Sequence, residues 1–66
     1  MLKLSIVGLG LMGKQHLKAI NEHPNCKIVS IIDNSYTAEV FAKKEQCRYY
    51  TNLKEAISHT CPDGLI

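Results

Sequence analysis

Four short apolar runs alternate along the chain with segments whose apolar residues recur at helical spacing. The runs at residues 2–7, 27–33, 48–50 and 64–66 are dominated by Leu, Ile, Val and Tyr, and each predicts a strand. Ile6 and Val7 are adjacent and both apolar, which predicts a first strand buried on both faces, as in a parallel sheet.

The first helix is expected over residues 10–22. Gly13, Leu17 and Ile20 follow one another at i, i+4 and i+7, so they share one stripe of that helix. Pro24 ends it, because the residue before a proline is disfavoured in helical geometry.

Two further helices are expected. The second begins after Asn34 or Ser35, either of which can serve as the N-cap, and it ends near Glu45. The third covers residues 51–58, with Asn52 as its cap. The resulting order β-α-β-α-β-α-β, with short connections, predicts an α/β fold in which helices cover a parallel sheet.

Length and composition limit the alternatives. The 66 residues make one small domain at most, and the fourth strand is cut off after three residues, so the chain is interpreted as part of a larger protein. Its net charge of +2 is scattered, without a basic stripe interleaved with aromatics, which argues against nucleic acid as a partner. No apolar run is long enough for a membrane span or a signal peptide, and a cytoplasmic location is expected.

Residues 8–13, Gly-Leu-Gly-Leu-Met-Gly, have the form G-x-G-x-x-G, placed directly after a strand and at the start of a helix. In a dinucleotide site Gly8 would allow the tight turn, Gly10 would let a pyrophosphate approach the backbone, and Gly13 would let the helix pack against the strand. The free N–H groups around Leu11 and Met12 would then point at the phosphates. The motif therefore predicts a doubly wound, Rossmann-type sheet that binds a dinucleotide.

An acidic residue supports the same interpretation. Asp33 ends the second strand, 20 residues after Gly13, where a carboxylate can accept hydrogen bonds from an adenosine ribose. It would also repel a 2′-phosphate, which favours NAD over NADP, and Asn34 is counted with it as a cofactor-binding residue. Two alternatives stay open: glycines that serve only the turn with Asp33 as a mere helix cap, and a flavin as the cofactor.

The segments LSIVGLGLMGKQHLKAI, KIVSIIDNSYTAEVFAKKEQCRYYTNLKEAI and PDGLI together resemble the N-terminal domain of the Gfo/Idh/MocA oxidoreductases over essentially all 66 residues. The more specific marks are His16, three positions after the last glycine, and the run Tyr50-Thr51-Asn52-Leu53. One departure is Gln46, at a position after the second helix where many relatives carry a glycine in the left-handed conformation.

The resemblance implies an NAD-dependent dehydrogenase that transfers a hydride to or from a sugar or polyol-like alcohol. Residues 1–66 would form the N-terminal portion of its dinucleotide-binding domain. The rest of that domain and a substrate domain that often mediates homo-oligomerisation would lie outside. The catalytic groups of the family lie further along, so no catalytic residue is assigned in this chain. His16 is expected on the inward edge of the first helix, in a packing role.

Two other functions are considered. The run GLGLMG also begins the β-hydroxyacid dehydrogenases, although Asp33 and the spacing of His16 favour the first family. The chain alone could also be a non-catalytic fragment that binds a nucleotide, and a free edge beside the first strand would then favour pairing between copies.

Overall fold

The computed structural model describes residues 1–66 and contains four strands and three helices in the predicted alternation. Their bounds are β1 Leu2–Val7, α1 Leu11–Asn21, β2 Cys26–Ile32, α2 Tyr36–Lys44, β3 Arg48–Tyr50, α3 Leu53–Thr60 and β4 Gly64–Leu65. The expected boundaries agree to within about two residues, because a glycine, a proline or a capping side chain marks most of the ends. None of the three helices has the length and apolar character needed to cross a membrane.

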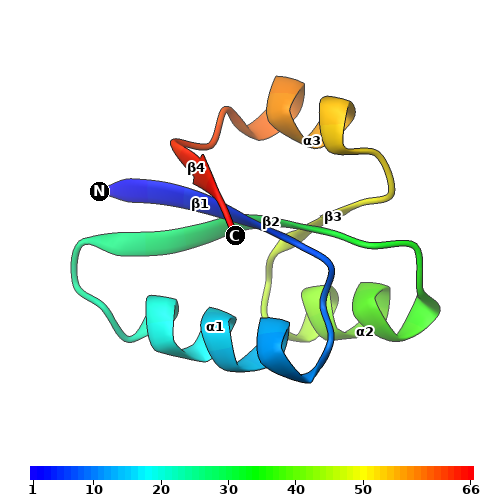
Figure 1. Cartoon of the computed structure of the whole chain (residues 1–66), viewed down its shortest axis with the longest axis horizontal. Coiled ribbons are helices and arrows are strands. Elements are labelled where there is room, and N and C mark those ends of the chain that lie inside the picture. The colour runs from blue at the N-terminus through cyan, green and yellow to red at the C-terminus, as the bar shows by residue number, and fades with distance from the viewer.

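All strand pairs are parallel, and the strand order is β3-β2-β1-β4. Helices α1 and α2 lie on one face of the sheet and α3 lies on the other (Figure 1). The first two crossovers thus run outward from β1 in one direction, and the third returns the chain to the opposite side of β1. This arrangement is the doubly wound α/β fold expected from the sequence, and its direction changes between β1 and β4.

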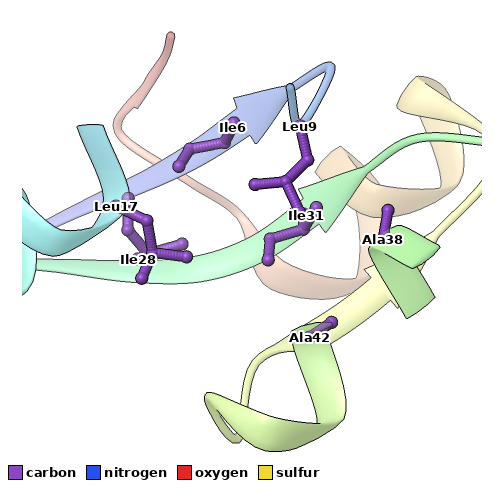
Figure 2. Packing of buried hydrophobic residues seen from close by; sticks show 7 residues of the cluster. All are labelled: Ile6, Leu9, Leu17, Ile28, Ile31, Ala38 and Ala42. Atoms are coloured by element: carbon purple, nitrogen blue, oxygen red, sulfur yellow. The ribbon is translucent and has the colours of Figure 1, made fainter. Parts of the chain in front are cut away.

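The main core lies between the sheet and helices α1 and α2. It consists of seven buried apolar side chains, Ile6, Leu9, Leu17, Ile28, Ile31, Ala38 and Ala42 (Figure 2). The two alanines face the sheet from α2, and their small size lets that helix approach closely. Leu9 leaves the glycine turn and reaches the same cluster, so the turn is packed into the core by its own side chain.

A bulge in β2 sets which side chains reach this core. Leu4 pairs with Ile28 and Ser5 pairs with Ser30, so Val29 is an extra residue on the β2 side. The bulge allows Ile28 and Ile31, three positions apart, to contribute to the same core. Simple strand alternation does not predict this outcome.

The first strand is buried on both faces at its centre, as expected, but not at its carboxyl end. Ser5 and Ile6 point to opposite faces and are both buried, whereas Val7 remains 44% exposed. The reason is that α3 packs against β2 and β3, which leaves the end of β1 uncovered on that face. The edge of β1 is not free either, because β4 pairs with it at Leu4 and Ser5.

Under α3, two serines form a buried hydrogen bond between neighbouring strands. The hydroxyl oxygens of Ser5 and Ser30 lie 2.6 Å apart, and both residues are fully buried. Because burying a hydroxyl without a partner costs free energy, each serine depends on the other. The pair therefore links β1 and β2 through a buried side-chain hydrogen bond.

We expect Ser30→Ala to lower the free energy of unfolding by about 1–3 kcal/mol, since it leaves the Ser5 hydroxyl unpaired. The double replacement Ser5→Ala with Ser30→Ala should cost less than Ser30→Ala alone, because no orphaned hydroxyl remains. Urea unfolding followed by circular dichroism measures both. If the double variant loses as much free energy of unfolding as Ser30→Ala, or more, the hydrogen bond is not the stabilising element.

The end of α2 departs from the usual glycine. Gln46 adopts a φ of 59°, in the left-handed region, and its N–H donates to the carbonyl of Lys43 at 3.1 Å. A residue with a side chain is strained there, whereas glycine is not. Helix α2 ends at Lys44, within one residue of the expected end near Glu45, and glutamine occupies the left-handed position at which many relatives carry glycine.

Gln46→Gly should raise the free energy of unfolding by roughly 0.5–1 kcal/mol, because the relief of strain exceeds the added freedom of the unfolded chain. Lys44→Gly is the matched control, since Lys44 lies in the last turn of α2 and a glycine there should destabilise by about 1 kcal/mol. If the two replacements change the free energy of unfolding in opposite directions, the left-handed backbone conformation of Gln46 is the cause of the stabilisation.

Candidate dinucleotide-binding site

The glycine turn lies at the carboxyl ends of the strands, between β1 and α1. Gly8 has a φ of +82°, which L side chains rarely adopt, and its N–H donates to the carbonyl of Ile32 at 2.8 Å. The chain therefore reverses direction at Gly8 while still bonded to β2. This geometry matches the role that the sequence assigned to the first glycine.

The third glycine permits close packing of α1 on the turn. A Cβ built on Gly13 would lie 2.9 Å from the carbonyl oxygen of Gly8, closer than real Cβ atoms come to a backbone oxygen. Gly13 is buried, and Leu9 and Ile6 surround the same position at 3.4 and 3.6 Å. Only glycine fits here without a backbone shift.

The second glycine faces open space. A Cβ on Gly10 would meet nothing within 4 Å, and its φ of −95° is one that other residues adopt readily. Nothing inside the chain thus requires a glycine at this position. A ligand that must come close to the backbone does require one, which is the role expected of Gly10.

Helix α1 begins at this turn without a side-chain cap. Gly10 is its N-cap residue and supplies no side-chain acceptor, so the N–H groups of the first turn lack an intramolecular capping partner. Leu11 and Met12 are exposed at this end, and the helix dipole adds positive charge there. The arrangement suits an anionic group such as a pyrophosphate.

Asp33 ties the turn to the end of β2. Its Oδ2 accepts the N–H of Leu9 at 2.7 Å, and its Oδ1 accepts the N–H of Asn34 at 2.6 Å. The Leu9 N–H is the main cause that holds the pKa of Asp33 below its usual range, against partial desolvation that raises it. Asp33 is therefore a carboxylate held beside the glycine turn.

Asp33 is not the cap of the following helix. Ser35 is the N-cap of α2, and its hydroxyl oxygen accepts the N–H of Ala38 at 3.1 Å. Of the two candidates for that cap, Ser35 is the one used. Asn34 is exposed beside Asp33, at the same edge of the sheet as the glycine turn.

His16 and Lys14 follow the glycine motif in α1. His16 is exposed, and the expectation that it faces inward is wrong. It precedes the buried Leu17 by one residue, so it lies about 100° around the helix from the side that faces the sheet. Lys14 places its Nζ 5.3 Å from the ring centre of Phe41, so it extends towards α2.

The contact from Asp33 to the Leu9 N–H was not anticipated from the sequence. The spacing of motif and acid places both at the carboxyl edge of adjacent parallel strands, but it does not show that the carboxylate closes onto the turn. The structure thus brings together Gly8, Gly10, Leu11, Met12, Gly13, Asp33 and Asn34 along one edge of the sheet, where ligands of open α/β sheets bind.

Comparisons with known proteins address the family and the fold. The Gfo/Idh/MocA family model, described as an oxidoreductase family with an NAD-binding Rossmann fold, matches residues 2–66. The structure is similar to the WlbA dehydrogenase from Bordetella pertussis in complex with NADH and UDP-GlcNAcA, with a TM-score of 0.84 and 24% sequence identity. The match covers 97% of this chain and 20% of the dehydrogenase. No curated protein matches significantly.

Proposed function

Because the chain belongs to the Gfo/Idh/MocA oxidoreductases and forms their NAD-binding Rossmann fold, we propose that it is the cofactor-binding part of a dehydrogenase acting on a sugar or polyol-like alcohol. Residues 1–66 would supply the first part of the dinucleotide-binding domain. The observation that carries the proposal is the joint geometry of the turn: open space at Gly10, close packing at Gly13 and a carboxylate at Asp33.

In this proposal each element of the site holds one part of the dinucleotide. The N–H groups at the start of α1, around Leu11 and Met12, bind the pyrophosphate, and Gly10 leaves room for it. Asp33 accepts hydrogen bonds from the adenosine ribose while it keeps the Leu9 N–H in place. When bound, the nicotinamide supplies the hydride chemistry, and this chain supplies position.

The substrate class rests on similarity. The WlbA structure contains UDP-GlcNAcA, a nucleotide sugar, and the chain spans one fifth of that protein's length. A sugar-like alcohol is therefore the substrate class we propose for the whole enzyme. The general base of the reaction and the residues that bind the substrate would come from outside residues 1–66.

The carboxylate of Asp33 makes NAD the expected cofactor. A 2′-phosphate on the ribose would lie beside this negative charge and repel it, so NADP should bind roughly tenfold or more weakly than NAD.

The test is a titration of the ¹⁵N-labelled chain with NAD and, separately, with NADP. We expect the amide signals of Gly8, Gly10, Gly13 and Asp33 to shift with NAD and to shift less with NADP. Glu39→Gln serves as a control, because it removes one exposed acidic charge in α2 and should leave the NAD titration unchanged. A dispersed spectrum that ignores both dinucleotides would rule out the proposed function.

A further inference from the structure

A polar pocket lies far from the glycine turn, at the amino ends of the strands. Its lining includes four basic side chains, Lys3, Lys27, Arg48 and His59, together with Gln46 and Thr60. No carboxylate lines it. The four basic residues come from β1, β2, β3 and the last turn of α3. The fold therefore gathers them from positions up to 56 residues apart in the sequence.

Strand register places the three strand cations on one face of the sheet. Leu4 packs against the core under α1 and α2, so its neighbour Lys3 points to the α3 face. Lys27 is the direct partner of Lys3 across the parallel pair and shares that face. On β3, Tyr49 packs against the same core, so Arg48 also points to the α3 face.

Helix α3 closes one side of this pocket. The ring of His59 lies edge-on to the ring of Tyr50, with centroids 5.6 Å apart, which seats the histidine over the sheet beside β3. Lys27, Arg48 and His59 are exposed, and Lys3 is half-buried, so all four basic groups are accessible from solvent.

Lys3 and Lys27 repel each other in this arrangement. Adjacent strands are about 4.8 Å apart, and like charges directly opposite one another destabilise a sheet. Asp63 lies beside this pair, and its Oδ2 accepts the backbone N–H of Lys3 at 2.8 Å. Asp63 thus places one negative charge next to Lys3, but no carboxylate lines the pocket between the basic groups.

Gln46 adds a second unusual feature to the same place. It holds a left-handed backbone conformation that favours glycine, and it lines the pocket beside the basic side chains. A glycine would remove the strain but also remove the side-chain amide, which can donate hydrogen bonds to an oxyanion. Strained non-glycine residues tend to occur where a side chain is needed.

We infer that this pocket binds a small, multiply charged oxyanion, at a site separate from the dinucleotide. Two lysines, an arginine and an amide match the oxygens of such an anion, with Arg48 able to form paired hydrogen bonds. Binding relieves the repulsion between Lys3 and Lys27. The glycine turn lies at the opposite, carboxyl edge of the sheet, so both ligands can bind at once.

The inference is tested with inorganic pyrophosphate added to the ¹⁵N-labelled chain in the presence of excess NAD, which competes for the glycine turn. We expect the amide signals of Lys27, Arg48, His59 and Thr60 to shift. Lys27→Gln should weaken binding at least fivefold, and Gln46→Gly should weaken it as well. Lys18→Gln, which removes an exposed charge from α1 on the other face, should leave it unchanged.

Shifts confined to Gly10–Gly13 would mean that pyrophosphate binds only at the glycine turn. Equal weakening by Lys18→Gln and Lys27→Gln would mean a general attraction to positive charge. Either result would overturn the inference. Melting temperature gives a second test. Without any anion, Lys27→Gln should melt a few degrees higher than the native chain, and pyrophosphate should raise the melting temperature of the native chain but not of Lys27→Gln. A lower melting temperature for Lys27→Gln alone would contradict the proposed repulsion.

Discussion

Gly13→Ala is expected to abolish NAD binding and to lower the free energy of unfolding by about 1–3 kcal/mol. The added methyl group would lie 2.9 Å from the Gly8 carbonyl oxygen, and Gly8 cannot move away freely because its own N–H is bonded to β2. Helix α1 must therefore shift away from the turn. A domain of this size is only marginally stable, so melting should fall by roughly 5–20 °C, as circular dichroism would show.

Gly10→Ser is the control that separates binding from folding. The Cβ of a serine at this N-cap position meets nothing within 4 Å, and its hydroxyl can cap α1. The melting temperature should stay the same or rise slightly, whereas NAD binding should weaken at least tenfold because the side chain occupies the approach of the pyrophosphate. If Gly10→Ser binds NAD normally, the pyrophosphate does not lie where we propose.

Asp33→Asn is expected to weaken NAD binding by at least tenfold and to destabilise the turn. The carboxylate accepts the N–H groups of Leu9 and Asn34, and an amide can satisfy only one of them because its NH₂ group faces the other. The same replacement removes the charge that repels a 2′-phosphate. The ratio of NADP to NAD affinity should therefore rise, which isothermal titration calorimetry can measure.

Asp33 also makes stability depend on pH in a defined direction. The Leu9 N–H holds the pKa of Asp33 below its unfolded value, so its contribution to stability is complete above the usual carboxyl range. That contribution is lost as the pH falls through the lowered pKa. Over this range the free energy of unfolding should therefore fall more steeply with decreasing pH for the native chain than for Asp33→Asn. Identical acid profiles would show that the hydrogen bond to Leu9 does not stabilise the fold.

Much of the fold could be predicted from the sequence because local signals mark its elements. The apolar runs, the G-x-G-x-x-G turn and the caps at Ser35 and Asn52 each act over a few residues, and the structure uses them as expected. The acid at the end of β2 could be placed near the turn for the same reason. Parallel strands bring their carboxyl ends to one edge.

The features that sequence reasoning missed depend on tertiary packing. Val7 is apolar yet exposed because α3 covers β2 and β3 and leaves the end of β1 open. The sequence does not show which strands α3 covers. His16 is exposed beside the buried Leu17, because neighbouring residues of a helix point about 100° apart and a shift of one position decides whether a side chain is covered. The bond from Asp33 to Leu9 joins side chain and backbone across 24 positions, and no local pattern encodes it.

The strand order has a consequence for how the chain acquires its structure over time. Strand β4 pairs with β1, and the contacts between Lys3 and Asp63 close a loop of 60 residues. Closing so long a loop is entropically costly, so this pairing should form after the nearer β1–β2 and β2–β3 pairs. During synthesis one edge of β1 then waits unpaired until the segment Gly64–Leu65 has been made. The hydrogen-bonding groups of that edge are open to other chains for the whole interval, which favours aggregation during it.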